Sequence, residues 1–133
     1  MKDFIPYECS IDLQSIGFDI RPDFGNQTSL YDKEGRQIFY TNYGVMGSGL
    51  SEGYIYAPTF SQAFRWLLDK HYLYGIIIPT VTMDWTFKTM TVIQDMIEVP
   101  PYNHVHAYDY SRREEAELAC LNKLIEIVKN QKD

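Results

Sequence analysis

The feature that most constrains this chain is a broad apolar stripe near its C-terminus. Apolar residues recur there at helical spacing, which predicts an amphipathic helix from about Arg112 to about Lys129. The expected buried face consists of Ala116, Cys120, Leu121, Leu124, Ile125, Ile127 and Val128. Ser111 and Glu114 have the spacing of a capping box and predict where the helix starts. Because a face this broad must be covered, we expect the helix to pack across a sheet.

Two shorter helices are predicted upstream. The first is expected to begin at Pro6, which needs no backbone donor there, and to end at Gly17, which tolerates a left-handed conformation. The second has a capping-box pattern in Thr59 and Gln62, and Gly75 is expected to mark its end. Together with the C-terminal helix, these elements give three amphipathic helices.

Runs of β-branched and aromatic residues separate the helices. One hairpin is predicted over residues 29–43, with Gly35 in its turn, and a second over residues 76–93. Residues 54–56 and 104–108 are expected to add short strands. The predicted fold class is therefore α+β: a small antiparallel sheet built from two hairpins, packed by three amphipathic helices, the last at the C-terminus.

Length and composition narrow the class of protein further. A chain of 133 residues fits a single domain, residues 1–133, and no repeat or linker divides it. The formal net charge of −6 and the lack of a basic patch disfavour nucleic-acid binding.

No stretch has the length or apolar character of a signal peptide or a membrane span, so we expect a cytoplasmic protein that does not bind membranes. Cys9 and Cys120 fall on apolar helical faces and are expected to be buried free thiols.

Eleven tyrosines in so short a chain allow two interpretations. Packing in a β-rich core is the first, because aromatic residues favour strands. A binding face is the second, because tyrosine is enriched at protein interfaces. The candidate contact residues are Trp66, Tyr102, Tyr108 and Tyr110.

A histidine pair gives the main candidate for a metal site. His104 and His106 are two residues apart and would point to one side of an extended segment. Zinc needs at least a third ligand, and Asp109, Asp95 or Glu98 could provide it. The same alternation also describes the polar face of an ordinary strand, and we favour that interpretation.

The segment 44–53 contains four glycines and invites comparison with a phosphate-binding loop. Such a loop needs a helix directly after it and usually a lysine, and the sequence provides neither. We expect a contact loop instead, and no cofactor.

Three parts of the chain carry a resemblance to a known group of proteins. They are residues 5–8 with 16–19, residues 57–59 with 62–66, and residues 114–117 with 121 and 124–127. In these segments the chain resembles a family of small uncharacterised proteins from gut Bacteroidales genomes and their phages or mobile elements. The resemblance covers about a third of the chain and implies a genomic context, but it assigns no activity and no functional residue.

The sequence therefore favours a non-enzymatic binding or accessory protein that acts through protein–protein contacts, with self-association as one option. The alternative is a small metal-dependent hydrolase or nuclease that uses His104, His106 and Asp109. No arrangement typical of nucleophilic catalysis is recognisable in the order of residues.

Overall fold

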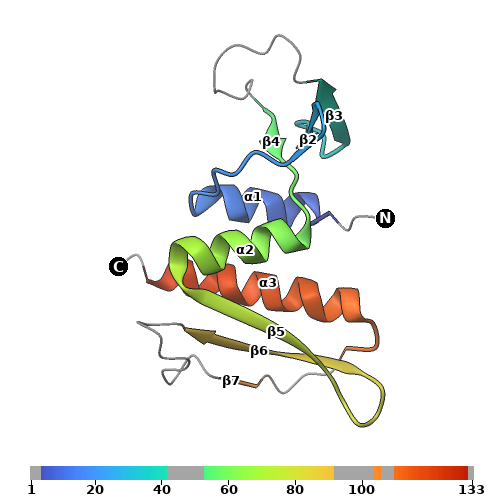
Figure 1. The fold of residues 1–133 in the computed structure, drawn as a ribbon, viewed down its shortest axis with the longest axis vertical. Coiled ribbons are helices and arrows are strands. Elements are labelled where there is room, and N and C mark those ends of the chain that lie inside the picture. Colours follow the sequence, from blue (N-terminus) through green and yellow to red (C-terminus); the bar gives the residue numbers. More distant parts are fainter. Residues whose placement is uncertain (1–3, 42–52, 92–103, 106–109, 132–133) are drawn as a thin grey trace. The chain divides into compact units, whose positions relative to one another are not determined.

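The computed structural model describes residues 4–41, 53–91, 104–105 and 110–131 (Figure 1). The elements are α1 (Tyr7–Ser15), β1 (Asp23–Phe24), β2 (Gln27–Tyr31), β3 (Gln37–Thr41), β4 (Ile55–Tyr56), α2 (Phe60–His71), β5 (Leu73–Pro79), β6 (Trp85–Thr91), β7 (His104–Val105) and α3 (Arg113–Asn130). The α+β class is confirmed, as is a C-terminal position of the last helix. The chain divides into two compact units, residues 1–62 and 63–133, and each is described by itself. The single domain stays a prediction.

The first unit contains a sheet centred on β2. Strand β3 pairs antiparallel with the whole of β2 on one edge. On the opposite edge of β2, β1 pairs antiparallel with Gln27 and Thr28, and β4 pairs antiparallel with Leu30 and Tyr31. The turn between β2 and β3 has Gly35 at φ +83°, as predicted for this hairpin. The Asp32 carboxylate holds the turn by accepting hydrogen bonds from the backbone N–H groups of Glu34 (3.0 Å) and Arg36 (2.9 Å). The backbone hydrogen bond from Arg36 is the main reason that the pKa of Asp32 is lowered.

Helix α1 begins at Tyr7 with Pro6 as its N-cap, one residue later than predicted. Ile5, Cys9, Leu13 and Ile16 recur at helical spacing and are all buried. The helix ends at Ser15 with Ile16 as its C-cap, and Gly17 follows with φ +103°, in the left-handed region as predicted. The Phe18 N–H then donates to the Leu13 carbonyl at 3.2 Å. With the hydrogen bond from the Gly17 N–H to the Gln14 carbonyl at 3.0 Å, this is the Schellman arrangement that ends many helices.

The start of helix α2 was predicted correctly and its end was not. The Thr59 N–H donates to Gln62 Oε1 at 2.9 Å, and the Gln62 N–H donates to Thr59 Oγ1 at 3.2 Å, which completes the capping box. The helix ends at His71, and Tyr72 takes the left-handed conformation at φ +56°. Gly75 lies inside β5 and does not terminate the helix.

The second unit explains why a glycine stands at position 75. A Cβ atom on Gly75 would lie 2.5 Å from Cys120 Sγ, 3.2 Å from Leu124 Cδ1 and 3.3 Å from Phe64 Cε1. Helices α2 and α3 thus bring side chains directly against the backbone of β5. The glycine is required for this close approach, and the sequence pattern alone suggested a helix stop instead.

Strands β5, β6 and β7 form the sheet of the second unit, in that order and antiparallel. Helix α3 packs along β5 and β6 (Figure 1). Pro79 ends β5, which is an edge strand among the described residues, where a residue without a backbone N–H is tolerated.

The expectation of one sheet built from two hairpins needs correction. Each hairpin belongs to its own sheet: β2 and β3 lie in the first, and β5 and β6 in the second. Alternation of residue types shows which segments form strands, but strand edges pair through backbone groups that carry no sequence signal.

Helix α3 buries all seven residues of its predicted apolar face. Its cap, however, is one residue later than expected. Glu115, and not the predicted Glu114, forms the cap. The Glu115 carboxylate accepts hydrogen bonds from the Arg112 N–H and from the Ser111 hydroxyl, both at 3.1 Å. Within the described residues, no helix is both long enough and apolar enough to cross a membrane.

Candidate functional site

The predicted metal ligands lie almost entirely outside the described residues. His106, Asp109, Asp95 and Glu98 are not described, and of His104 only the backbone is, in β7 opposite Thr89. In the part of the chain that is described, no group of three metal-ligating side chains occurs. The metal site stays a prediction.

Two of the four predicted contact residues, Tyr102 and Tyr108, also lie outside the described residues. Tyr110 is described and forms a two-way backbone bridge with Trp85, with N···O distances of 2.7 and 2.6 Å. Its ring stacks on Phe87 with 6.3 Å between centroids. These contacts hold Tyr110 against the first residues of β6, and the ring is half-buried.

The bridge places Tyr110 next to a cation–π contact. The guanidinium carbon of Arg113, the first residue of α3, lies 5.7 Å from the centroid of the Trp85 ring. This contact joins the start of α3 to the start of β6. Sequence reasoning did not find it, because Trp85 and Arg113 are far apart along the chain and neither belongs to a recognisable motif.

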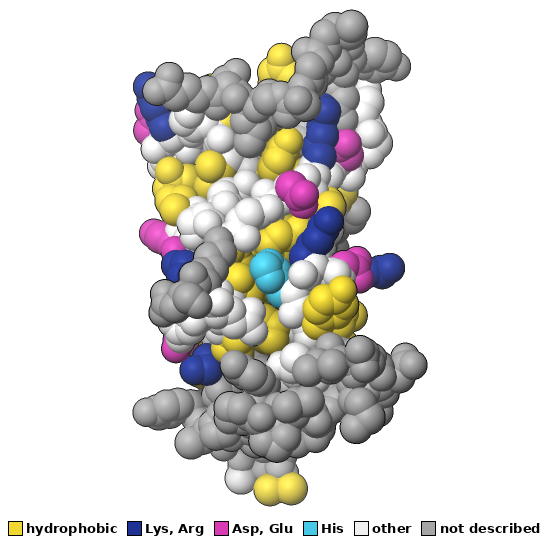
Figure 2. All heavy atoms as spheres, turned by 90° about the vertical axis from the view of Figure 1, so that its left-hand side faces the viewer, with side chains coloured by type: hydrophobic (Ala, Val, Ile, Leu, Met, Phe, Trp, Pro, Cys, Tyr) yellow, Lys and Arg dark blue, Asp and Glu magenta, His cyan; other side chains and the backbone are white. Residues whose placement is uncertain are grey.

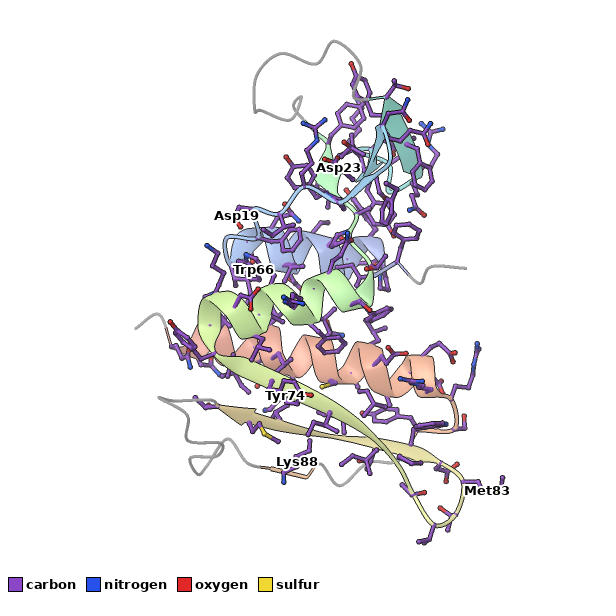
Figure 3. All side chains as sticks on the ribbon, in the orientation of Figure 1. Asp19, Asp23, Trp66, Tyr74, Met83 and Lys88 are labelled. Atoms are coloured by element: carbon purple, nitrogen blue, oxygen red, sulfur yellow. The ribbon has the colours of Figure 1, made fainter. Side chains whose placement is uncertain are left out.

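Trp66 occupies a different setting, in the middle of α2 (Figure 3). Trp66 is only 4% exposed, and its ring and the His71 ring make a T-shaped contact with 5.1 Å between the ring centroids. His71 is the histidine whose side chain the structure describes, and Figure 2 shows it on the surface with hydrophobic side chains and a basic side chain next to it. A partner would therefore contact the residues around Trp66 more than the indole itself.

A surface that the sequence did not indicate is the loop between β5 and β6. We call residues 80–84 the hairpin tip. Its backbone is closed by two hydrogen bonds, from the Thr80 N–H to the Asp84 carbonyl (2.8 Å) and from the Met83 N–H to the Thr80 carbonyl (3.1 Å). Met83 has φ +68°, a conformation that costs a non-glycine residue about 1 kcal/mol or more.

Polar side chains reinforce the hairpin tip. The Thr80 hydroxyl accepts a hydrogen bond from the Asp84 N–H at 3.2 Å and lies 3.0 Å from the Thr82 hydroxyl. Thr82 in turn donates to Asp84 Oδ2 at 3.4 Å. The loop therefore has a defined shape although it is exposed to water.

The apolar side chains of the hairpin tip point into solvent. Val81 is fully exposed and Met83 is 88% exposed, and Figure 3 shows Met83 at the turn, beyond the ends of both strands. No other large hydrophobic side chain in the described ranges is exposed to this degree. The sequence predicted a hairpin over residues 76–93, which contains this turn. The sequence did not predict the exposed apolar pair, because exposure depends on what packs nearby.

The two cysteines are buried free thiols, as predicted. Desolvation raises the pKa of Cys9 to about 12, and nearby Asp12 adds to the effect. Desolvation also raises the pKa of Cys120 to about 12, with Glu117 as the second cause. A thiol that keeps its proton at neutral pH is a poor nucleophile, so neither residue is suited to covalent catalysis.

The glycine-rich segment, residues 44–53, lies outside the described residues except for Gly53. The prediction of a contact loop there stays a prediction.

Comparison of the chain with protein-family models, with curated proteins and with solved structures gives no match.

Proposed function

We propose that this chain is a non-enzymatic binding protein that acts through protein–protein contact, with the hairpin tip as one contact element. The observation that carries the proposal is the exposure of Val81 and Met83 on a turn held by hydrogen bonds. Single exposed apolar residues are common on protein surfaces. Two such residues on one ordered turn of five residues are more typical of a contact site.

The order of the turn supports a binding role on energetic grounds. A loop that already has its bound shape loses little conformational entropy when a partner docks. Burying the valine and methionine side chains would contribute roughly 1.5–3 kcal/mol each. Methionine is flexible and polarizable, so it adapts to an irregular pocket.

The chemistry of the hairpin tip also indicates what kind of partner fits. Asp84 is the acidic residue of the turn, and its backbone and side chain already take part in the internal hydrogen bonds. Recognition would therefore be mainly apolar, by a pocket on another protein that admits Val81 and Met83. The resemblance of the three sequence segments supports an accessory role for the chain in a Bacteroidales phage or mobile element.

The test is a pull-down with the full chain as bait, from a lysate of a Bacteroidales host. We expect Val81→Ser/Met83→Ser to lose the captured partner. The matched control is Ile11→Ser/Ile20→Ser, which removes two partly exposed apolar side chains elsewhere. A partner that binds the wild type and both variants equally, or the absence of any partner, would count against the proposal.

A further inference from the structure

Strand β3 presents an edge that pairs with no other strand among the described residues. β3 forms its backbone ladder with β2 on one side only, over the register from Gln27 opposite Thr41 to Tyr31 opposite Gln37. A strand edge offers a row of N–H and C=O groups that another strand can satisfy. The edge lies wholly within the first unit.

Hydrogen bonds on the far side of β2 show which groups of β3 face outward. The Ser29 N–H donates to the Pro22 carbonyl at 3.1 Å, and the Ser29 carbonyl accepts from the Ala57 N–H at 3.0 Å. Ser29 thus directs both groups away from β3. Phe39 stands opposite Ser29 in the register. Because Ser29 directs its main-chain groups away from β3, the two residues form a non-hydrogen-bonded pair, and Phe39 directs its own N–H and C=O away from β2.

The same alternation makes the edge symmetric about Phe39. Main-chain groups alternate in direction along a strand, so Gln37 and Thr41 also direct their N–H and C=O groups outward. Three outward residues therefore lie at equal spacing, with Phe39 in the middle.

The side chains of β3 lack the usual protection of an edge strand. Natural edges are commonly blocked by a lysine, a proline or a bulge, and residues 37–41 contain none of these and no charge. Phe39 is 47% exposed and Tyr40 is 55% exposed. One side of the Phe39 ring is already occupied by Phe4, at 5.9 Å between centroids.

We infer that this edge pairs antiparallel with β3 of a second copy of the chain, about a two-fold axis at Phe39. Gln37 of each copy would then face Thr41 of the other copy, so this pair would occur twice. The three outward residues of each strand would form about six main-chain hydrogen bonds between the copies. The Phe39 rings would meet across the axis, and Ile38 would face Tyr40 on the opposite side of the sheet. Aromatic pairs and aromatic–β-branched pairs favour such cross-strand contacts.

Self-pairing is favoured over an unrelated strand because the edge is its own complement. Each pair formed about the axis joins uncharged residues, so no like charges oppose each other. An interface of this size is small, and a reversible dimer is expected that forms at roughly 10 µM to 1 mM chain. The inference is independent of the hairpin tip, which lies in the other unit.

Charge-pair variants test both the edge and its register by sedimentation equilibrium of the full chain. Gln37→Glu/Thr41→Lys places opposite charges together in two cross-strand pairs, so we expect roughly 2- to 30-fold tighter dimerisation than in the wild type. Gln37→Lys/Thr41→Lys places like charges together twice and is expected to weaken dimerisation by a similar factor. Both variants lose the same Gln37 side-chain bond to Ser29, so this loss does not distinguish them.

Several outcomes would overturn the inference. A wild-type chain that stays monomeric up to about 1 mM has no such edge contact. Equal dissociation constants for the two variants would place the dimer contact elsewhere, and weaker dimerisation of Gln37→Glu/Thr41→Lys would indicate a parallel register. A second measurement needs no substitution: amide exchange at Phe39 should slow as the wild-type concentration rises, and unchanged exchange would contradict the pairing.

Discussion

At the scale of single residues, Gly75 shows how a missing side chain sets the distance between elements. Replacing Gly75 with alanine would place a Cβ 2.5 Å from Cys120 Sγ, closer than van der Waals contact allows. Overpacking of this kind costs about 1–3 kcal/mol. We expect Gly75→Ala to lower the free energy of unfolding by that amount, measured by urea denaturation.

A double-mutant cycle separates the clash from other effects of this substitution. Cys120→Ala removes the atom that the new methyl group would meet, so Gly75→Ala should cost less in that background than in the wild type. Equal costs in both backgrounds would show that the clash with Cys120 is not the cause.

The buried thiols provide a second prediction at this scale. With a pKa of about 12 in the folded chain against 9.0 for an ordinary thiol, Cys9 and Cys120 carry about a thousandfold less thiolate at pH 8 than in the unfolded chain. Iodoacetamide labelling followed by mass spectrometry should therefore be far slower in buffer than in urea. Equal labelling rates would contradict the burial of these residues.

The same shift fixes the sign of a pH effect on stability. Each folded pKa lies above the unfolded value, so the folded chain binds more protons than the unfolded chain between these values. The contribution of the neutral thiols is complete below about pH 9 and is lost as the pH rises toward 12. Cys9→Ala and Cys120→Ala should each flatten the fall in stability over this range.

At the scale of elements, the cap of α3 distinguishes two neighbouring glutamates. Glu115 accepts the hydrogen bonds of the cap, whereas Glu114 makes an exposed ion pair with Arg112 at 3.6 Å. Glu115→Ala should lower the free energy of unfolding by about 0.5–2 kcal/mol, and Glu114→Ala by less than about 0.5 kcal/mol.

These two variants are closely matched. Both remove one negative charge from the first turn of the helix, so both lose a similar interaction with the helix dipole. The difference between them in thermal or urea unfolding therefore compares the cap at Glu115 with the exposed ion pair between Glu114 and Arg112. A larger loss for Glu114→Ala would favour the capping box expected from the sequence.

At the scale of the whole molecule, the rival function can be separated from the proposed one by metal analysis. A binding protein without a metal centre should retain less than stoichiometric zinc after incubation with zinc and desalting. If the chain instead retained one zinc ion, and His104→Ala/His106→Ala abolished that retention, the metal-dependent hydrolase or nuclease would be favoured. The double variant also serves as the control for non-specific metal binding.

The helices illustrate how far the sequence could predict this fold. The seven buried residues of α3 were identified because a helical face repeats every 3.6 residues. The cap of α2 was identified because Thr59 and Gln62 interact within one turn. Gly75 was misread because its partner Cys120 is distant in sequence, and a glycine after a helix is usually a stop signal.

The candidate site was less predictable, for the same reason. Tyr110 was predicted as a contact residue because tyrosine is common at interfaces. Its contacts with Trp85 and Phe87 join residues that are more than 20 positions apart, so the sequence did not indicate them. Val81 and Met83 are ordinary strand-forming or apolar residues in the sequence. Only the structure shows that nothing within the described residues covers them.

The sequence by itself determined where helices and turns form, because capping bonds, left-handed glycines such as Gly17 and Gly35, and apolar periodicity act within a few residues. The C-terminal helix, with its broad apolar face, is the clearest case. Tertiary structure alone decided that the hairpins belong to two sheets, that α3 packs along β5 and β6, and that β3 is an edge strand among the described residues. Those outcomes depend on backbone pairing and contacts between residues far apart in the chain, which no local pattern encodes.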